Sequence, residues 1–237
     1  AFTLDPDGVG WITFDDPDRS QNVLDESVMS TLRRRLEQAR TSAADGRLSV
    51  LVFISGKPGR FIAGANIDDI AAITDPADGE LKARLGQQLY QQIEELAVPT
   101  VAAIDGLCLG GGFELALACR FRVCSDAEAT RMALPEVQLG LLPGWGGTTR
   151  LPRLVGLRAA LEPLLSGASV RPSKARRIGL VSQVLPAAGF RQHVHAFAER
   201  TPALGSQASR PAHRWPSRLV DDSLIGRQLV LRVARRR

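Results

Sequence analysis

Two continuous apolar runs constrain the fold of this chain more than any other feature. LSVLVFISG spans residues 48–56 and PTVAAIDG spans residues 99–106. Neither run alternates apolar with polar residues, as a strand with one wet face would, so both are typical of strands buried on both faces. A helix is expected between them, around residues 80–96. Buried, roughly parallel strands that alternate with helices predict an α/β protein.

Other segments fit the same alternation. VGWITFDD (residues 9–16) alternates apolar and polar residues between Gly8 and Pro17, which predicts a half-buried strand. A helix is expected from about residue 25 to residue 44, and RFRVCSD is expected to be another strand. Two further helices are expected in LVGLRAALEPLLSG and SKARRIGLV, after the glycine-rich loop LPGWGGTTR.

Length and composition indicate one folded domain with an appendage. The chain has 237 residues, 44% of them hydrophobic, which is enough for a sizeable core. We expect a domain over residues 1–200, a linker rich in Pro, Ser, Ala and Arg over residues 201–218, and an Arg-rich helix over residues 219–237. No apolar run approaches the ~20 residues that cross a bilayer, so we expect no membrane span and a cytoplasmic location.

The cysteines and the charge distribution narrow the function classes. Cys108, Cys119 and Cys124 lie in apolar surroundings without metal-ligand spacing, so we expect reduced core residues and no metal site. The net charge is +5, but residues 190–237 hold ten arginines against three acidic residues, which is +7 and leaves −2 for the rest. This tail has no aromatic interleaving, so we expect no nucleic-acid partner, although contact with nucleic acid or an anionic lipid surface stays an alternative.

Two glycine-containing segments are suited to bind a negatively charged oxygen. In FIAGANI (residues 61–67), Gly64 and Ala65 follow a strand, and small residues there let a ligand approach the backbone N–H closely. In GLCLGGGFE (residues 106–114), Gly110, Gly111 and Gly112 open a helix, whose first N–H groups lack intrahelical partners and carry a partial positive charge.

Two glutamates belong to the same constellation. Glu114 falls in the first turn of that helix and leans toward its N-terminus, and Glu136 follows Pro135 at a strand-to-loop boundary. Two carboxylates and two N–H donors suit a carbonyl whose oxygen gains charge while a proton and a water are moved. Each feature alone is as readily a turn, cap or packing device. A dinucleotide or nucleotide site is a less favoured alternative, because GLCLGGG lacks the G-x-G-x-x-G order and the chain has no G-K-[ST].

Four separated motifs together resemble the crotonase (enoyl-CoA hydratase/isomerase) superfamily. They are FIAGANI, AAIDGLCLGGGFELALACR, LPEVQLGLLPGWGGTTRLPRLVG and the segment from Ala175 to Val181. Within the family the chain is most similar to the N-terminal hydratase part of multifunctional fatty-acid oxidation alpha subunits. The resemblance implies the crotonase (ClpP-like) fold, in which repeated ββα units form two roughly perpendicular sheets surrounded by helices.

The resemblance also implies roles for individual residues. The family's oxyanion hole maps onto the N–H groups of Ala65 and Gly111, and its catalytic glutamates map onto Glu114 and Glu136. The coenzyme A (CoA) part of the substrate would contact Gln21, Asn22, Val23, Ala63, Gly64, Asn66, Ile67, Gly110 and Gly112.

The implied reaction is syn addition of water to a trans-2-enoyl-CoA, giving a 3-hydroxyacyl-CoA in fatty-acid β-oxidation. Glu114 would deprotonate the water and Glu136 would protonate C2; no cofactor is expected, because CoA is part of the substrate. Retention of both glutamates favours hydration, with double-bond isomerisation as a second activity.

Some features depart from the family pattern. Trp145 stands where a small residue is common, and Thr149 replaces a frequent glutamine. The alternative function is a non-catalytic acyl-CoA-binding or assembly module. Expected partners are the acyl-CoA thioester and either copies of the chain, as a trimer or hexamer, or a dehydrogenase or thiolase component, because the chain resembles a fragment or a shortened descendant of the longer enzymes.

Overall fold

The computed structural model describes residues 1–204 and residue 223. The expected Arg-rich helix at residues 219–237 and nearly all of the expected linker at residues 201–218 therefore lie outside the described residues. Within the described part, no helix combines the length and apolar character needed to cross a membrane.

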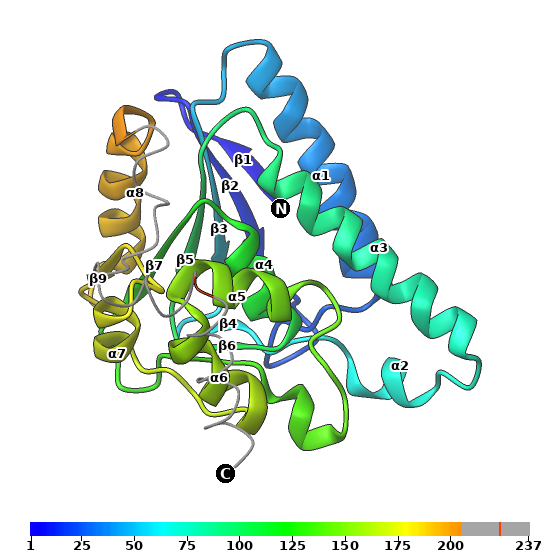
Figure 1. Cartoon of the computed structure of the whole chain (residues 1–237). Helices are drawn as coiled ribbons and strands as arrows, with labels where there is room; N and C mark the ends of the chain where they lie inside the picture. Colours follow the sequence, from blue (N-terminus) through cyan, green and yellow to red (C-terminus); the bar gives the residue numbers. More distant parts are fainter. Residues whose placement is uncertain (205–222, 224–237) are drawn as a thin grey trace.

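The described strands form two sheets (Figure 1). The larger sheet has six strands in the order β1-β2-β3-β5-β7-β9, parallel throughout except for the antiparallel pair β1 and β2. The smaller sheet is parallel, in the order β4-β6-β8. The bounds are β1 Phe2–Leu4, β2 Val9–Phe14, β3 Val50–Ser55, β4 Arg60–Ile62, β5 Thr100–Ile104, β6 Leu107–Leu109, β7 Phe121–Ser125, β8 Arg131–Ala133 and β9 Gln183–Leu185.

Helices surround the larger sheet. In Figure 1 the long helices α1 and α3 run side by side across one side of the sheet, and α8 lies on the other side. The bounds are α1 Glu26–Ala44, α2 Ile67–Ala71, α3 Pro76–Glu94, α4 Gly111–Ala118, the 3₁₀ helix η1 Pro135–Leu139, α5 Gly147–Val155, α6 Leu157–Ser166, α7 Pro172–Arg177 and α8 Phe190–Arg200.

The continuous apolar runs are buried on both sheet faces, as the sequence predicts. In β3, Val50 and Val52 pack toward α8, whereas Leu51 and Phe53 pack into the larger core with α1 and α3. Because successive side chains of a strand point to opposite faces, a strand covered on both sides must be apolar at every position. The three cysteines are free and buried, as expected.

The long elements match the predicted ranges closely, and several elements differ. The helix expected in SKARRIGLV ends at Arg177, and β2 is buried on both faces rather than half-buried. The helix expected at residues 80–96 begins earlier, at Pro76, because the Asp75 side chain accepts a hydrogen bond from the Ala77 N–H and proline suits a first helical turn. The segment LPGWGGTTR is only partly a loop, since α5 begins at Gly147 within it.

The smaller sheet places the functional loops. β4 follows β3, β6 follows β5 and β8 follows β7, so each strand of the smaller sheet continues from a strand of the larger one. This is the repeated β-β-helix pattern that the sequence analysis expected. Because β4, β6 and β8 are parallel, their carboxyl ends lie at the same edge, and the three segments that follow them meet there.

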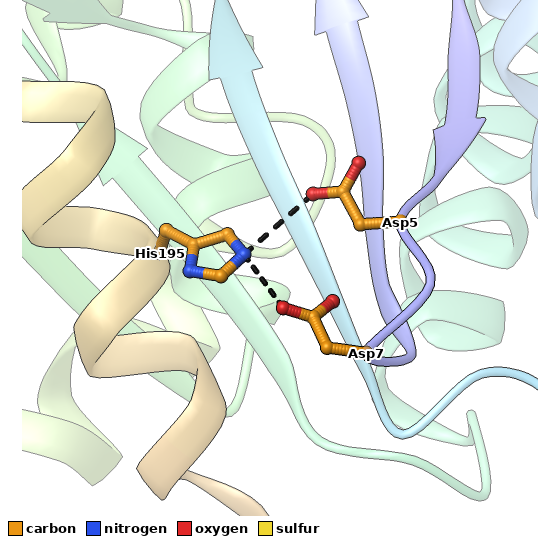
Figure 2. A group of neighbouring side chains, drawn as sticks. All are labelled: Asp5, Asp7 and His195. Atoms are coloured by element: carbon orange, nitrogen blue, oxygen red, sulfur yellow. Dashed lines mark ion pairs between the residues drawn. The ribbon is translucent and has the colours of Figure 1, made fainter.

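Ion pairs anchor α8 to the turn between β1 and β2 (Figure 2). His195 Nε2 lies 2.9 Å from Asp7 Oδ2 and 3.7 Å from Asp5 Oδ2, and its Nδ1 lies 3.5 Å from Glu199 Oε2. The imidazole also stacks on Trp11, whose indole N–H donates to Asp5. The cluster therefore fixes α8 over its face of the larger sheet.

Candidate active site

Three segments converge at the carboxyl edge of the smaller sheet. Residues 63–66 follow β4, Gly110 and Gly111 follow β6, and Glu136 lies shortly after β8. The Gly110 N–H donates to the Ala133 carbonyl at 2.9 Å, which joins the second segment to the end of β8. A Cβ built on Gly64, whose φ is +114°, would lie 3.2 Å from the Leu109 carbonyl oxygen, so the first segment also packs against the second.

The Ala65 N–H points away from the segment at Leu24, with which Ala65 pairs. Leu24 pairs with Ala65 in a parallel bridge: its N–H donates to the Gly64 carbonyl at 2.8 Å, and its carbonyl accepts from the Asn66 N–H at 3.3 Å. In a parallel bridge the central residue directs its own N–H to the opposite side. Within the described part of the chain, no hydrogen bond engages that N–H.

The Gly111 amide begins helix α4. As the first helical residue it has no intrahelical acceptor, and none is found for its N–H among the described residues. The helix dipole adds a partial positive charge at this end. The buried Tyr90 hydroxyl donates to the Gly111 carbonyl at 2.7 Å, which fixes the orientation of the turn.

Glu114 is buried in the first turn of α4, with 2% of its surface exposed. Its Oε1 accepts hydrogen bonds from the Trp145 N–H at 2.9 Å and the Gly147 N–H at 2.7 Å. Burial raises the pKa of this carboxyl, the Gly147 and Trp145 N–H donors lower it and the nearby Glu136 charge raises it, and the net pKa is about 7. Near neutral pH Glu114 is therefore divided between its two protonation states.

Glu136 lies in η1, next to the glycine turn. A Cβ built on Gly110 would lie 2.9 Å from Glu136 Oε1, so the missing side chain at Gly110 makes room for this carboxylate. Glu136 Oε2 is buried and has no hydrogen-bond partner among the described residues. Burial raises the pKa of Glu136 above its ordinary value. A buried carboxylate oxygen without a partner is typical of a group that meets a ligand or a water.

The arrangement combines two kinds of chemistry. Two amides without acceptors, Ala65 and Gly111, can stabilise an oxygen that gains negative charge. Two coupled carboxylates with raised pKa values, Glu114 and Glu136, can exchange protons with a bound water near neutral pH. The structure therefore brings together the four residues that the sequence analysis singled out for chemistry.

The residues predicted to contact CoA divide into those that can face a ligand and those that have a packing role. Residues 21–23 lie beside residues 63–66, because the Ala63 N–H donates to the Asn22 carbonyl at 2.9 Å. The Asn22 side chain is buried, however, and bonds to Phe14, Ser55 and Phe61, so only its backbone can face a ligand.

Gly112 also has a packing role. A Cβ built on Gly112 would lie 2.6 Å from Ile62 Cβ, so its lack of a side chain lets α4 pack against β4. Its prediction as a CoA contact finds no geometric support. Gly64 and Gly110 lie at the contact between the two segments, and the Asn66 side chain caps α2.

Sequence reasoning missed the positioning role of several residues, including Trp145, which it had noted only as a departure from the family pattern. Trp145 and Gly147 hold Glu114, Tyr90 holds Gly111, and Arg150 donates to the Trp145 carbonyl at 2.6 Å. The available signals were weak: Tyr90 is the sole tyrosine of the chain, and Trp145 interrupts a glycine-rich segment. The contacts of Glu114 with Trp145 and Gly147 span 31 and 33 positions, and that of Tyr90 with Gly111 spans 21, so they leave no local pattern in a sequence.

One group of donor atoms could hold a metal ion. In the described residues, the ligand atoms of Asp5, Asp7 and His195 lie within 4.8 Å of one another (Figure 2). These side chains are about one-third exposed and already form ion pairs, and they lie on the β1–β2 turn and α8 rather than at the carboxyl edge of the smaller sheet. They are accounted for as the anchor of α8.

Comparison with known proteins agrees with the geometry. A family described as Enoyl-CoA hydratase/isomerase matches residues 5–216. The alpha subunit of the fatty acid oxidation complex of Idiomarina loihiensis is 42% identical over 239 residues, and that of Vibrio vulnificus is 40% identical over 236 residues. Each alignment covers 99% of this chain but 32% of the relative, so the chain spans about a third of the length of these curated relatives.

Solved structures give the same fold. The structure of enoyl-CoA hydratase from Bacillus anthracis superimposes with a TM-score of 0.77 at 26% identity and covers 99% of this chain and 89% of that one. The Geobacillus kaustophilus enzyme described in the same terms also gives 0.77, at 30% identity, and covers 98% of this chain and 83% of that one. The two-sheet architecture is therefore the crotonase fold, as predicted.

Proposed function

The chain belongs to the enoyl-CoA hydratase/isomerase family, and from this premise we propose that it adds water to a trans-2-enoyl-CoA to give a 3-hydroxyacyl-CoA. The observation that carries the proposal is that two carboxylates, Glu114 and Glu136, lie beside a glycine turn whose amide lacks an acceptor in the described structure. The similarity to fatty acid oxidation subunits supports a role in fatty-acid β-oxidation.

The thioester oxygen binds between the Ala65 and Gly111 N–H groups. These donors draw electron density from the conjugated double bond, so that C3 becomes electrophilic. When the oxygen of water bonds to C3, the π electrons move toward the thioester oxygen and form an enolate-like species that the two N–H groups stabilise. One such donor is worth about 10²–10³-fold in rate, so the pair supplies a large part of the catalysis.

The two glutamates manage the protons. Glu114 takes a proton from the water as the water oxygen bonds to C3, and Glu136 gives a proton to C2, so that one C–O bond and one C–H bond replace the π bond between C2 and C3, and one O–H bond of the water is broken. Glu114 is suited to the first role because two N–H donors fix its Oε1 and orient the carboxylate. Glu136 is suited to the second because its buried Oε2 has no partner in the described structure and burial favours its protonated form.

The CoA portion of the substrate runs along the backbone of residues 21–23 and 63–67. Gln21, Val23 and Ala63 are partly exposed, and Ile67 is largely exposed at the start of α2. These residues can therefore contact a ligand that continues outward from the Ala65 amide.

Isomerisation is a second candidate activity, and the position of Glu136 favours it. Moving a double bond from C3 to C2 requires one carboxylate to remove a proton from C2 and return it at C4. The unpartnered oxygen of Glu136 provides such a carboxylate beside the oxyanion donors. An acyl-CoA-binding module without turnover would share the pocket and is separated by the experiment below.

The longer relatives suggest partners. Because the similar proteins are subunits of a fatty acid oxidation complex, a dehydrogenase or thiolase component is the proposed partner, with self-association into trimers or hexamers as the alternative. Sedimentation of the chain alone distinguishes the two.

Glu136→Gln tests the proposal. We expect turnover of crotonyl-CoA to fall by about 10²–10⁴-fold, the usual contribution of a general acid, while affinity for a saturated acyl-CoA persists. The rate is followed by the loss of enone absorbance. Glu128→Gln, the same change at an exposed glutamate between β7 and β8, is the matched control and retains wild-type turnover.

Two outcomes would contradict the proposal. Full activity in Glu136→Gln would remove this residue from the mechanism. Binding of acyl-CoA by the wild-type chain without turnover of any enoyl-CoA or 3-enoyl-CoA would favour the non-catalytic module.

A further inference from the structure

The turn before α5 grips the Glu114 carboxylate. The Trp145 and Gly147 N–H groups both donate to Glu114 Oε1, at 2.9 and 2.7 Å. Gly146 lies between the two donors with φ +110°, in the left-handed region that glycine favours. Two backbone N–H groups that flank a residue in this conformation form a concavity that binds an anion. In this turn the anion is the ionised form of Glu114.

Arg150 holds the middle of this turn. Its Nη1 donates to the Trp145 carbonyl at 2.6 Å, which belongs to the peptide unit between the two units that donate to the carboxylate. A Cβ built on Gly146 would overlap the same nitrogen, so the guanidinium lies across the turn in space that only a glycine leaves open. The backbone N–H of Arg150 also donates to the Gly146 carbonyl at 2.9 Å. Side chain and backbone of one residue therefore both bond to the turn.

The guanidinium is itself anchored on α3. Its Nε and Nη2 donate to the two carboxylate oxygens of Glu94, at 3.0 and 3.1 Å, and 13% of the Arg150 side chain is exposed. Because a planar guanidinium matches a carboxylate with two parallel hydrogen bonds, this pair fixes both its position and its orientation. Gln87, also on α3, donates to the Gly144 carbonyl at 2.8 Å, in the peptide unit that carries the Trp145 N–H. Helix α3 therefore supports the turn at two points.

We propose that Arg150 is a positioning residue for Glu114, the base of the proposed reaction: anchored on Glu94, it holds the turn so that both N–H donors stay directed at one oxygen of the carboxylate. This inference rests on the proposed function, since it assigns a role in the same reaction. Arg150 acts through the turn and touches no reacting atom. A base that is held in one orientation meets its water in the geometry of proton transfer, and a small misplacement is costly in rate.

The charges around Glu114 give this role a signature in pH dependence. The titratable groups near its carboxyl are Glu136 in η1, Tyr90 on α3 and Arg150 on α5. Burial raises the pKa of Tyr90 well above its ordinary value, so the phenol is neutral at neutral pH. Burial also raises the pKa of Glu114, as does the charge of Glu136, whereas the N–H donors of the turn and the charge of Arg150 lower it. Losing the guanidinium removes a lowering charge and loosens the lowering donors, so both effects move the pKa of Glu114 upward.

Hydration of crotonyl-CoA over a range of pH tests the proposal. In Arg150→Met we expect kcat to fall by about 10- to 10²-fold with little change in KM, and the acid limb of kcat/KM to move to higher pH. Arg150→Lys keeps the charge but not the planar fork, so its kcat should fall less and its acid limb should stay closer to that of the wild type. Arg153→Met, the same change at an exposed position of α5, is the matched control and keeps the wild-type profile.

Titration of the carboxyl itself provides a readout that does not depend on turnover. Carbon NMR of protein with labelled glutamate carboxyl groups follows Glu114, whose signal is identified by its absence in Glu114→Gln. We expect this carboxyl to titrate at higher pH in Arg150→Met than in the wild type, and at the wild-type pH in Arg153→Met. If Arg150→Met does not fold, Glu94→Gln, which weakens the anchor of the guanidinium, should lower kcat by a smaller factor.

The failures can be told apart. If the wild-type chain turns over no enoyl-CoA, the proposed function fails and the role of Arg150 in it fails as well. If the wild type is active but Arg150→Met keeps the wild-type kcat and acid limb, only the assignment of Arg150 is overturned. A lower kcat in Arg150→Met with an unmoved acid limb and an unmoved titration of Glu114 would also overturn it, because Arg150 would then serve the stability of the fold alone.

Discussion

At the scale of single residues, Glu114 shows how one carboxylate is prepared for proton transfer. Burial alone would leave it protonated and inert, whereas two N–H donors from Trp145 and Gly147 stabilise its ionised form. The balance between these opposing effects puts its pKa at about 7. A group with this pKa gives and takes protons with little cost at neutral pH, as efficient general acid–base catalysis requires.

The activity should depend on pH through Glu114. Because the base must be ionised, we expect kcat/KM for crotonyl-CoA to fall tenfold per pH unit below about pH 7, the pKa of this carboxyl. The pH–rate profile at a fixed low substrate concentration measures this limb. An acid limb near pH 4.5, the ordinary glutamate value, would show that the buried Glu114 is not the base.

The same carboxylate should make stability depend on pH. The folded protein binds the Glu114 proton up to about pH 7, whereas the unfolded chain releases it near pH 4.5, so folding stability falls as pH rises between these values. The full effect is about 3 kcal/mol, at ~1.4 kcal/mol per pKa unit. We expect Glu114→Gln to be more stable than the wild type at pH 8 and to lose this slope, as measured by urea unfolding at several pH values.

Glu128→Gln is the control for this measurement, since it makes the same change at an exposed position. Equal slopes in the wild type and Glu114→Gln between pH 4.5 and 7 would contradict the account of Glu114. The expected gain in stability also explains why such a residue indicates function: a buried glutamate is maintained at a cost to the fold.

At the scale of elements, helix α4 carries Gly111, the proposed oxyanion donor, and Glu114 at its N-terminal end and is anchored at its C-terminal end by Arg122. The buried guanidinium donates to the Ala116 and Cys119 carbonyls in the last turn of α4, and its Nε–H donates to the Leu180 carbonyl at 2.9 Å. A cation at the C-terminal end of a helix offsets the negative pole of its dipole. Burial lowers the pKa of Arg122 to about 10, so it remains charged at neutral pH.

Arg122→Met tests this anchor. Losing the guanidinium leaves several buried carbonyls without donors, at ~1–3 kcal/mol each, so we expect a fall in Tm of 10 °C or more in thermal unfolding. Arg33→Met, the same change at an exposed position of α1, should shift Tm by no more than about 2 °C. Similar shifts in the two variants would mean that Arg122 does not hold α4.

The elements also show what a sequence can and cannot predict. The long helices and the strands β3 and β5 were predictable because their periodicity extends over many residues and caps such as Asp25 mark their ends. The strands β4, β6 and β8 have three residues each, which is too short for a period to emerge. These three strands form the sheet that brings the site residues together. The candidate residues could be named from the sequence, but their arrangement followed only from the resemblance of the motifs to a known family.

The candidate site also has one part that the sequence predicts and another part that it does not predict. Gly111 and Glu114 share one local segment, and their relation follows from helix geometry. Ala65 and Glu136 lie far away in sequence, and only the parallel pairing of β4 and β8 with β6 brings them there. The Trp145 and Gly147 donors to Glu114, and the inward orientation of the Asn22 side chain, depend on tertiary contacts and left no signal.

At the scale of the whole molecule, the two sheets have separate tasks. The larger sheet, buried by α8 on one face and by α1 and α3 on the other, supplies the rigid core (Figure 1). The smaller sheet grows from its strands and presents three loops at one edge. A functional site at the carboxyl ends of parallel strands is a recurring consequence of α/β architecture.

The central claim is that one water is held between Glu114 and Glu136 beside an oxygen bound by the Ala65 and Gly111 amides. The proposed mechanism requires both carboxylates to address the same water from one side of the substrate. The hydroxyl at C3 and the new hydrogen at C2 should then be added to the same face.

Hydration of crotonyl-CoA in D₂O, with the product analysed by NMR, measures this most directly. We expect 3-hydroxybutyryl-CoA carrying one deuterium at C2, on the same face as the hydroxyl. Formation of no 3-hydroxy product, or deuterium on the opposite face, would contradict the account.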